Sequence, residues 1–125
     1  MSYNDESNTG LNTVCWSRRT GGSEKTHQTG IKTANALGLF DMSGNVWEWC
    51  YDMYDKDDPT SNDSAYMQED IIKNPKGPFS GDTRVGRGGG MGNSTPSDFG
   101  VCRRSGRIAN SPSKYLGFRI ARSVK

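Results

Sequence analysis

The chain has few apolar residues and no long apolar run. Only 31% of its 125 residues are hydrophobic, and its mean hydropathy is −0.83. No stretch is long enough for a membrane-spanning helix, and the first ten residues, MSYNDESNTG, lack the apolar segment of a secretory signal. We therefore expect a soluble protein with no membrane span and no signal peptide in this chain. Its compartment stays open.

Histidine and paired cysteines are also scarce. His27 is the single histidine, and Cys15, Cys50 and Cys102 lie far apart, with no Cys-x-x-Cys pair. This spacing excludes the usual kinds of zinc site. At most one disulfide can form among three cysteines, and the sequence does not decide whether one does. Cys50 and Cys102 are more typical of small, buried apolar side chains.

Glycine and aromatic residues are the abundant classes. The chain has 16 Gly, three Trp, five Tyr and four Phe. This composition predicts one loop-rich domain at most, with an aromatic rather than an aliphatic core. The net charge of +2 combines an acidic middle with a basic last third. Because the arginines there are spaced among glycines and apolar residues, we expect them to pair with the acidic middle and expect no nucleic-acid partner.

The clearest element is a strand over residues 46–51. Its β-branched and aromatic residues alternate, which places Trp47 and Trp49 on one face, and we interpret both as core residues. A glycine turn at residues 43–45 precedes the strand. Residues 1–30 are expected to be an extended loop with one short strand. A compact apolar piece lies ahead of the turn, at Leu37, Leu39 and Phe40.

The remaining elements are shorter. Residues 55–83 are predicted to form an acidic loop anchored by Ile71 and Ile72. Alternation in the last segment places Phe118 and Ile120 in the core. Three further short strands are expected, at residues 84–90, where the strand enters a glycine turn, 101–107 and 116–121.

Two carboxylates flank the glycine turn. Asp41 and Glu48 stand on either side of Gly44, and a turn there can aim backbone carbonyls inward while the carboxylates close an oxygen shell. Such a mixture suits a hard cation such as calcium. The alternative is that the carboxylates cap turns or pair with arginines.

Residues 35–50, NALGLFDMSGNVWEWC, resemble almost word for word the signature block of the formylglycine-generating enzymes, the sulfatase-modifying factor family. Further pieces follow in the family's order, so the resemblance covers nearly the whole chain from about residue 23. These pieces are residues 25–27 before Gly30, residues 74–78, the RGG segment at 84–89, Arg104 and Arg107, and the closing LGFR at 116–119.

The resemblance implies an α+β fold with low regular secondary structure, a formylglycine-generating-enzyme-like variant of the C-type lectin fold made mostly of short β-strands and long loops. It also implies that residues 1–125 are the C-terminal portion of a single sulfatase-modifying-factor domain, with the N-terminal part of the domain absent. The missing half would come from further sequence or from a partner. We expect the chain alone to fold marginally.

The resemblance places a calcium ion in the signature block. Its side-chain ligands would be Asp41 and Glu48, and its carbonyl ligands would come from Gly44 and Val46. These ligand types fit a hard cation.

The family's catalytic residues have no counterpart. The enzymes use two cysteines five residues apart, shortly after the glycine turn, to bind copper(I) and oxidise a substrate cysteine, and soft thiolates suit that ion. Residues 91–101 of this chain contain no cysteine, and Cys102 comes too late in the pattern. We therefore assign no catalytic residue, expect no copper, and do not expect the chain as given to be an enzyme.

Three functional hypotheses remain. The first is a binding module for an unknown protein or small ligand, calcium-stabilised and diversified by a retroelement, because loops on a fixed frame commonly carry recognition. The second is a part of a family enzyme, for cysteine-to-formylglycine oxidation of sulfatases or a related oxidation, whose other residues lie in missing sequence. The third is a degenerate fragment. The candidate ligand-binding residues are Asn93, Ser94, Thr95, Ser97, Asp98, Ile108, Asn110 and Tyr115.

Overall fold

The computed structural model describes residues 9–21, 24–54, 78 and 80–122. Most of this chain is loop, which confirms the expected α+β class with little regular secondary structure. The elements, in chain order, are α1 (Thr9–Val14), β1 (Cys15–Trp16), the 3-10 helix η1 (Arg18–Thr20), β2 (Ser43–Gly44), β3 (Trp47–Met53), β4 (Thr83–Arg87), the 3-10 helix η3 (Pro96–Phe99), β5 (Ser105–Ile108) and β6 (Leu116–Gly117).

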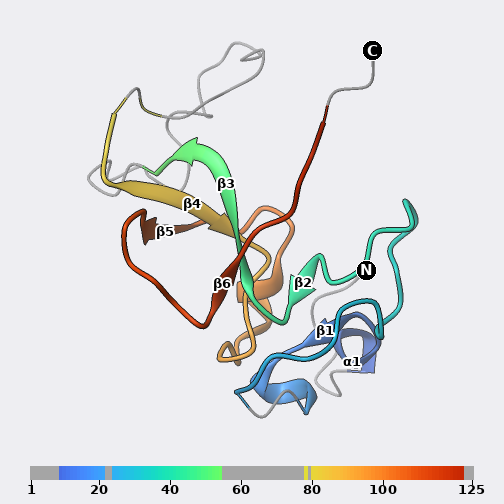
Figure 1. The fold of residues 1–125 in the computed structure, drawn as a ribbon. Coiled ribbons are helices and arrows are strands. Elements are labelled where there is room, and N and C mark those ends of the chain that lie inside the picture. Colours follow the sequence, from blue (N-terminus) through green and yellow to red (C-terminus); the bar gives the residue numbers. More distant parts are fainter. Residues whose placement is uncertain (1–8, 22–23, 55–77, 79, 123–125) are drawn as a thin grey trace.

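Two sheets organise the fold (Figure 1). The larger sheet has the strand order β5-β4-β3-β6, with β3 antiparallel to β4 and parallel to β6. The smaller sheet is the parallel pair of β1 and β2, which lies beside α1. The turn between β2 and β3 joins the two sheets, so the signature block lies at the centre of the molecule.

The core is small and mixed. Trp47 on β3 is 4% exposed, and it is the large ring on which the sheet packs, as predicted. Trp49, also predicted to be core, is only half-buried. Polar residues are buried beside the apolar ones, so hydrogen bonds must compensate for their lost hydration; these are Ser17, Thr20, Asp41 and Asn45. The buried hydrophobic side chains among the described residues are Cys15, Trp47, Val85, Met91 and Phe99.

The prediction that Phe118 and Ile120 belong to the core is wrong. Their side chains are 75% and 89% exposed. Strand β6 ends at Gly117, after two residues paired to β3, and the chain then leaves the sheet toward the C-terminus (Figure 1). Arg119 between them turns back to Glu48, which leaves its two apolar neighbours pointing elsewhere. Alternation predicted the two sides of the segment, but no neighbour covers the apolar side in the part of the chain that the structure describes.

Other local predictions fared unevenly. Strands at β3 and β4, and one short strand within residues 1–30, are confirmed. The helix α1 was not predicted, because its six mostly polar residues carry little helical periodicity. The strand expected over residues 101–107 begins only at Ser105, and the apolar piece before the turn is an exposed loop, with Leu37 81% exposed.

The predicted acidic loop of residues 55–83 falls mostly outside the described residues, and so do its anchors Ile71 and Ile72. The family-like segment 74–78 is likewise undescribed except at Pro78. Among the described residues, no helix has the length and apolar character needed to cross a membrane.

Candidate functional site

The signature turn, defined as residues 41–47, depends on backbone conformations that few residues adopt. Gly44 has a φ of +81° and Asn45 a φ of +62°. A Cβ atom at Gly44 would lie 2.5 Å from Cys15 Sγ and 2.8 Å from Trp16 N, so only glycine fits against β1. The Gly44 N–H donates to Gly88 O at 2.8 Å, which ties the turn to the loop after β4.

Asn45 links three segments, although the sequence reasoning did not single it out. Its side-chain amide accepts from His27 N at 3.0 Å and donates to His27 O at 3.1 Å. Its backbone N–H donates to Trp16 O, and its carbonyl accepts from Met91 N. The signal available in the sequence was the Gly-Asn dipeptide, because asparagine tolerates a positive φ better than most residues.

Asp41 is the best-placed of the predicted calcium ligands. It is only 8% exposed, and its Oδ2 accepts from Gly30 N at 2.8 Å. Its Oδ1 is buried and has no hydrogen-bond partner in the described structure. A buried carboxylate oxygen without a partner is costly, so this atom fits a bound cation or water.

Glu48 is already engaged by Arg119. The guanidinium donates from Nε to Oε2 at 2.6 Å and from Nη2 to Oε1 at 2.5 Å. It also donates to the carbonyls of Phe40 and Asp41, and hydrogen bonding to Glu48 raises the pKa of Arg119. The predicted alternative of pairing with arginine is therefore realised at Glu48. A carboxylate has about four lone-pair sites, so this pairing leaves room for a shared cation.

The predicted calcium ligands are brought together only partly. Asp41, Gly44, Val46 and Glu48 all lie on or next to the signature turn, and Arg119 contacts both Asp41 and Glu48. No group of three or more His, Cys, Asp or Glu side chains that could hold a metal occurs among the described residues. Two carboxylates and two carbonyls fit calcium only if water completes the shell.

Asn93, one of the predicted ligand-binding residues, holds the frame. Its Oδ1 accepts from Trp47 Nε1 and from Gly90 N, each at 2.9 Å. Its backbone O accepts from Arg18 N. Gly90 packs against the same ring, because a Cβ there would be 3.0 Å from Trp47 Cδ1. Both hydrogen bonds occupy the amide oxygen, which is therefore a structural acceptor.

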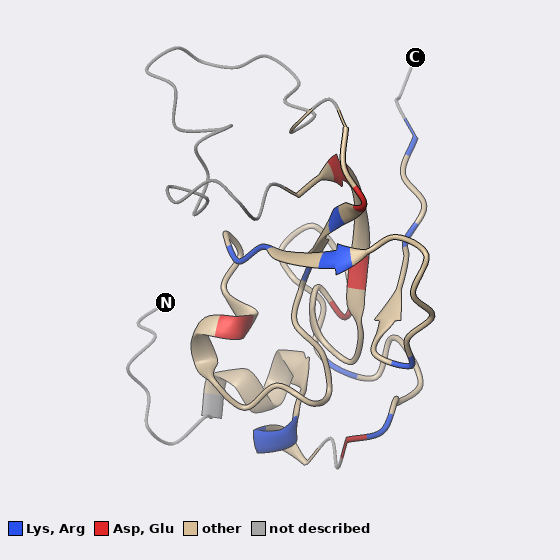
Figure 2. Cartoon of the chain, turned by 90° about the vertical axis from the view of Figure 1, so that its left-hand side faces the viewer, with Lys and Arg blue, Asp and Glu red and all other residues tan. Residues whose placement is uncertain are grey.

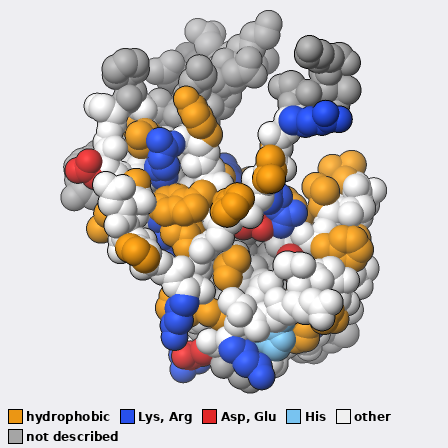
Figure 3. Space-filling view, viewed as in Figure 1, with side chains coloured by type: hydrophobic (Ala, Val, Ile, Leu, Met, Phe, Trp, Pro, Cys, Tyr) orange, Lys and Arg blue, Asp and Glu red, His pale blue; other side chains and the backbone are white. Residues whose placement is uncertain are grey.

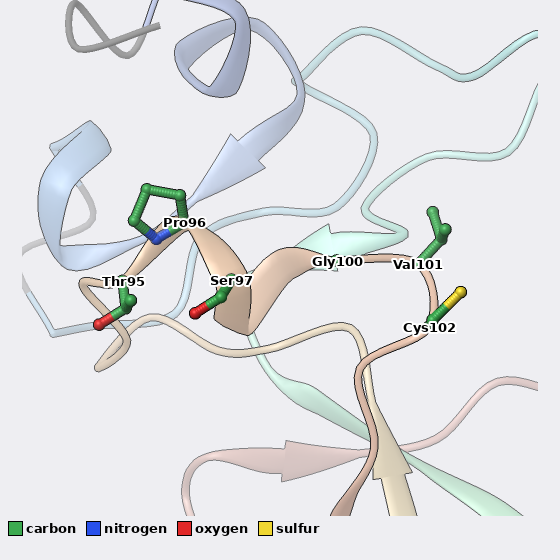
Figure 4. Close-up of a pocket in the computed structure, with 6 residues that line it drawn as sticks. All are labelled: Thr95, Pro96, Ser97, Gly100, Val101 and Cys102. Atoms are coloured by element: carbon green, nitrogen blue, oxygen red, sulfur yellow. The ribbon is translucent and has the colours of Figure 1, made fainter. Parts of the chain in front are cut away.

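Three of the other predicted binding residues line pockets. Thr95 and Ser97 line a pocket of about 550 Å³ with Pro96, Gly100, Val101 and Cys102 (Figure 4). Asn110 lines a second pocket of about 330 Å³, with Trp49, Ala109, Ser111, Pro112, Ser113 and Leu116. The polar loops thus border two separate pockets rather than one shared pocket.

The remaining four predicted binding residues, like Asn93, lie outside both pockets. Ser94 is exposed, and its carbonyl accepts from Arg19 Nη1 at 3.5 Å. Asp98 faces Arg103 at 3.9 Å. Ile108 is 63% exposed at the end of β5. Tyr115 contributes its carbonyl to Trp47 N at 2.8 Å.

The cysteines are dispersed and free. Cys15 is fully buried, and its burial raises its pKa to about 12. Burial also raises the pKa of the half-buried Cys50. Cys102 is exposed on the rim of the larger pocket, so its predicted burial is wrong. It lies in a turn before β5 rather than within a strand. Cys15 and Cys50 therefore have the opposite shift from the depressed pKa of a reactive thiolate.

Charge is arranged strand by strand (Figure 2). Arg84 and Arg87 lie on β4, the strand next to β3 with its acidic Glu48 and Asp52, and Arg107 lies one strand further, on β5. The predicted pairing with the acidic middle is seen at Arg119, whose guanidinium pairs with Glu48.

Comparison with known proteins gives a consistent result. The sequence model of the family described as "Sulfatase-modifying factor enzyme 1-like domain" matches residues 2–124. The formylglycine-generating enzyme of Streptomyces coelicolor is 39% identical over 89 residues, which are 70% of this chain and 26% of that protein. The serine/threonine-protein kinase Pkn1 of Chlamydia trachomatis is 37% identical over 92 residues, which are 74% of this chain and 14% of that protein.

A solved structure has a similar fold. Treponema denticola variable protein 1 superimposes with a TM-score of 0.72 at 30% identity, over 92% of this chain and 37% of that chain. The chain therefore spans only about a quarter of the Streptomyces relative and about a third of the Treponema structure.

Proposed function

Because the chain belongs to the sulfatase-modifying factor family, and its equivalent of the catalytic stretch contains no cysteine, we propose that it is a non-catalytic binding module on that family's frame. The observation that supports this proposal most strongly is the structural role of residues 90–93. In place of reactive thiols, this stretch supplies the buried Met91 and an amide that fixes Trp47. These residues hold the frame and leave the neighbouring loops free to contact a ligand.

The frame supports recognition in the loops on either side of it. The loop of residues 94–102 borders the larger pocket, and that of residues 109–113 the smaller. Both loops start at residues fixed by backbone hydrogen bonds. Arg18 N donates to Asn93 O, and Ala109 N donates to Asp82 O. Rigid anchors with exposed polar loops between them are the usual basis of a binding surface. We also propose that this frame is a variant of the C-type lectin fold.

Diversification of these loops is proposed in addition. It is supported by the likeness to a Treponema protein that is itself named a variable protein. We expect a near-copy of the 3′ end of the gene beside it, differing at the codons of the exposed loop residues. A genomic neighbourhood without such a copy would contradict diversification but not binding.

Calcium is proposed at the signature turn. Asp41 and Glu48 would supply carboxylate oxygens, Gly44 and Val46 carbonyls, and the ion would satisfy the buried Oδ1 of Asp41. A bound ion would stabilise the turn and has no assigned part in chemistry. We expect millimolar calcium to raise the melting temperature of the chain relative to EDTA, and Asp41→Asn to abolish the difference. Equal melting temperatures for the unmodified chain would contradict the site.

The curated relatives favour one alternative, that the chain is part of a family enzyme. Formylglycine-generating enzymes match it over 70% of its length. In that case the reacting thiols must come from sequence beyond this chain, because no pair with the family's spacing exists here.

Binding itself can be tested with arrays of glycans and peptides probed with the labelled chain. Two variants fill the pockets from exposed positions, Ser97→Trp in the larger and Asn110→Trp in the smaller. We expect selective binding that one of them removes, while the exposed control Arg18→Gln keeps it. No selective binding, or binding that both pocket variants retain, would contradict the proposed function.

A further inference from the structure

The smaller pocket has an aromatic wall and a polar rim. Trp49 and Leu116 come from adjacent strands, and the loop of residues 109–113 closes the other side. That loop contributes the polar residues Asn110, Ser111 and Ser113, all exposed. The Ser113 hydroxyl also accepts from Tyr115 N at 3.2 Å. At about 330 Å³ the pocket is at the lower end of the range of ligand sites, so it admits a single ring rather than a chain.

A cation lies on the same face of the sheet. Trp49 pairs with Gly86, and a Cβ at Gly86 would lie 3.1 Å from Arg107 Cγ and 3.6 Å from Trp47 Cε3. The absent side chain of Gly86 therefore lets Arg107 cross β4 beside Trp47. Its guanidinium ends 4.5 Å from the centre of the Trp47 ring.

Arg107 has no carboxylate partner in the described part of the chain. The ion pairs there involve other arginines, and the Nε of Arg107 is buried without a hydrogen-bond partner. Burial also lowers the pKa of this guanidinium, as expected for a cation that has lost water and gained no anion. A stacked, partly desolvated arginine favours an anionic partner, because the planar fork matches a carboxylate.

We propose that the smaller pocket, through Trp49 and Asn110, binds the ring of an acidic sugar such as a uronic acid, whose carboxylate reaches Arg107 on the same face of the sheet, outside the pocket lining. The inference rests on the proposed binding function and names its ligand class. The ring's C–H face would lie on Trp49, because polarised C–H bonds are attracted to the negative face of an aromatic ring. Its hydroxyls would bond to the amide and hydroxyl groups of residues 110–113. Its carboxylate would pair with Arg107.

The proposal can be tested by calorimetric titration with three probes. Glucuronate has ring and charge, glucose has the ring without the charge, and acetate has the charge without the ring. We expect glucuronate to bind at least about tenfold more tightly than either of the others, a preference that added salt reduces. Equal affinity for glucuronate and glucose, or no measurable binding of glucuronate, would overturn the assignment.

Variants locate the two contacts. Arg107→Gln should remove the preference for glucuronate over glucose, whereas Arg107→Lys should keep part of that preference. Arg18→Gln removes the same charge from an exposed site and should leave the preference unchanged. Trp49→Leu should weaken both sugars. A preference that survives in a folded Arg107→Gln protein contradicts the role of Arg107. A different outcome is that the array detects another ligand, whose binding Asn110→Trp or Ser97→Trp abolishes, while glucuronate does not bind. That result would support the binding module and contradict the acidic sugar as its ligand class.

Discussion

The signature turn and the C-terminal segment, residues 116–122, differ sharply in how they are held. In the turn, backbone and side-chain groups of Gly44 and Asn45 bond to β1, to the loop at His27 and to the loop after β4. In the C-terminal segment, Leu116 and Gly117 pair with β3 and Arg119 binds Glu48, while Phe118 and Ile120 remain exposed. Figure 3 shows hydrophobic side chains on the molecular surface. Polar bonding and backbone conformation, rather than apolar content, therefore distinguish how the two segments are attached.

This difference follows from the small core. With five buried hydrophobic side chains described, each well-satisfied turn contributes a large share of the stability. Substitutions that disrupt the turn should therefore destabilise the fold strongly. Substitutions of the exposed apolar side chains in the C-terminal segment should affect folding little.

The largest effect is expected from Gly44→Ala. The new methyl would overlap Cys15 Sγ and β1 at a φ of +81°, so we expect a loss of about 4 kcal/mol or more in the free energy of unfolding. Gly38→Ala is a matched control, because Gly38 has a φ of +74° but nothing within 4 Å. It should cost only about 1 kcal/mol in backbone strain. Urea denaturation followed by circular dichroism measures both, and equal losses would contradict the packing argument.

Asn93→Ala should have the next largest effect. It leaves the Trp47 indole N–H and the Gly90 N–H without their acceptor, which we expect to cost about 2 to 3 kcal/mol. Asn110→Ala is the control, since this exposed residue should change the stability by less than about 0.5 kcal/mol. Comparable effects of the two substitutions in the same denaturation experiment would argue that Asn93 belongs to the binding surface instead.

The buried thiol predicts a loss of stability at alkaline pH. The pKa of Cys15 is about 12 when folded, against an ordinary value near 9, so the unfolded chain releases its proton first. The contribution of this thiol is complete below about pH 9 and should fall by about 2 kcal/mol by about pH 11. Unfolding titrations at several pH values measure this slope. Cys15→Ala should remove most of the decrease in stability with pH, whereas Cys102→Ala, at an exposed site, should leave that decrease unchanged. An equal decrease in Cys15→Ala and the unmodified chain would contradict the assignment.

The smallest effect is expected in the C-terminal segment. Phe118→Ser and Ile120→Ser should each change the free energy of unfolding by less than about 0.5 kcal/mol, because both side chains already face solvent. They should also reduce self-association, since exposed apolar side chains promote it. A loss above about 2 kcal/mol in denaturation of either variant would show that these side chains are buried, as alternation had suggested.

Sequence reasoning succeeded where a motif encodes geometry. The Ser-Gly-Asn turn, the strand containing Trp47 and the glycine turn after β4 follow from residue types that restrict or permit particular backbone angles. It failed where an outcome depends on neighbours. Nothing in the alternation of Phe118 and Ile120 shows whether another segment covers them.

The candidate site was predictable in part for the same reason. Oxygen ligands around Gly44 could be proposed from spacing, but the two-bond pairing of Glu48 with Arg119 joins residues 71 positions apart. The exposure of Cys102 and the structural use of Asn93 also depend on distant partners. Asn45 was missed because its role is to bridge loops that only the fold brings together.

The most direct test of the central claim is an oxidation assay on this chain. It would be incubated with copper(I), oxygen and a peptide carrying the sulfatase-type Cys-x-Pro-x-Arg motif, with the Streptomyces formylglycine-generating enzyme as the positive control. Mass spectrometry would then look for conversion of the peptide cysteine to formylglycine. We predict no aldehyde from this chain while the control converts the same peptide. Aldehyde formed by this chain and lost in Cys50→Ser or Cys102→Ser would contradict a non-catalytic module.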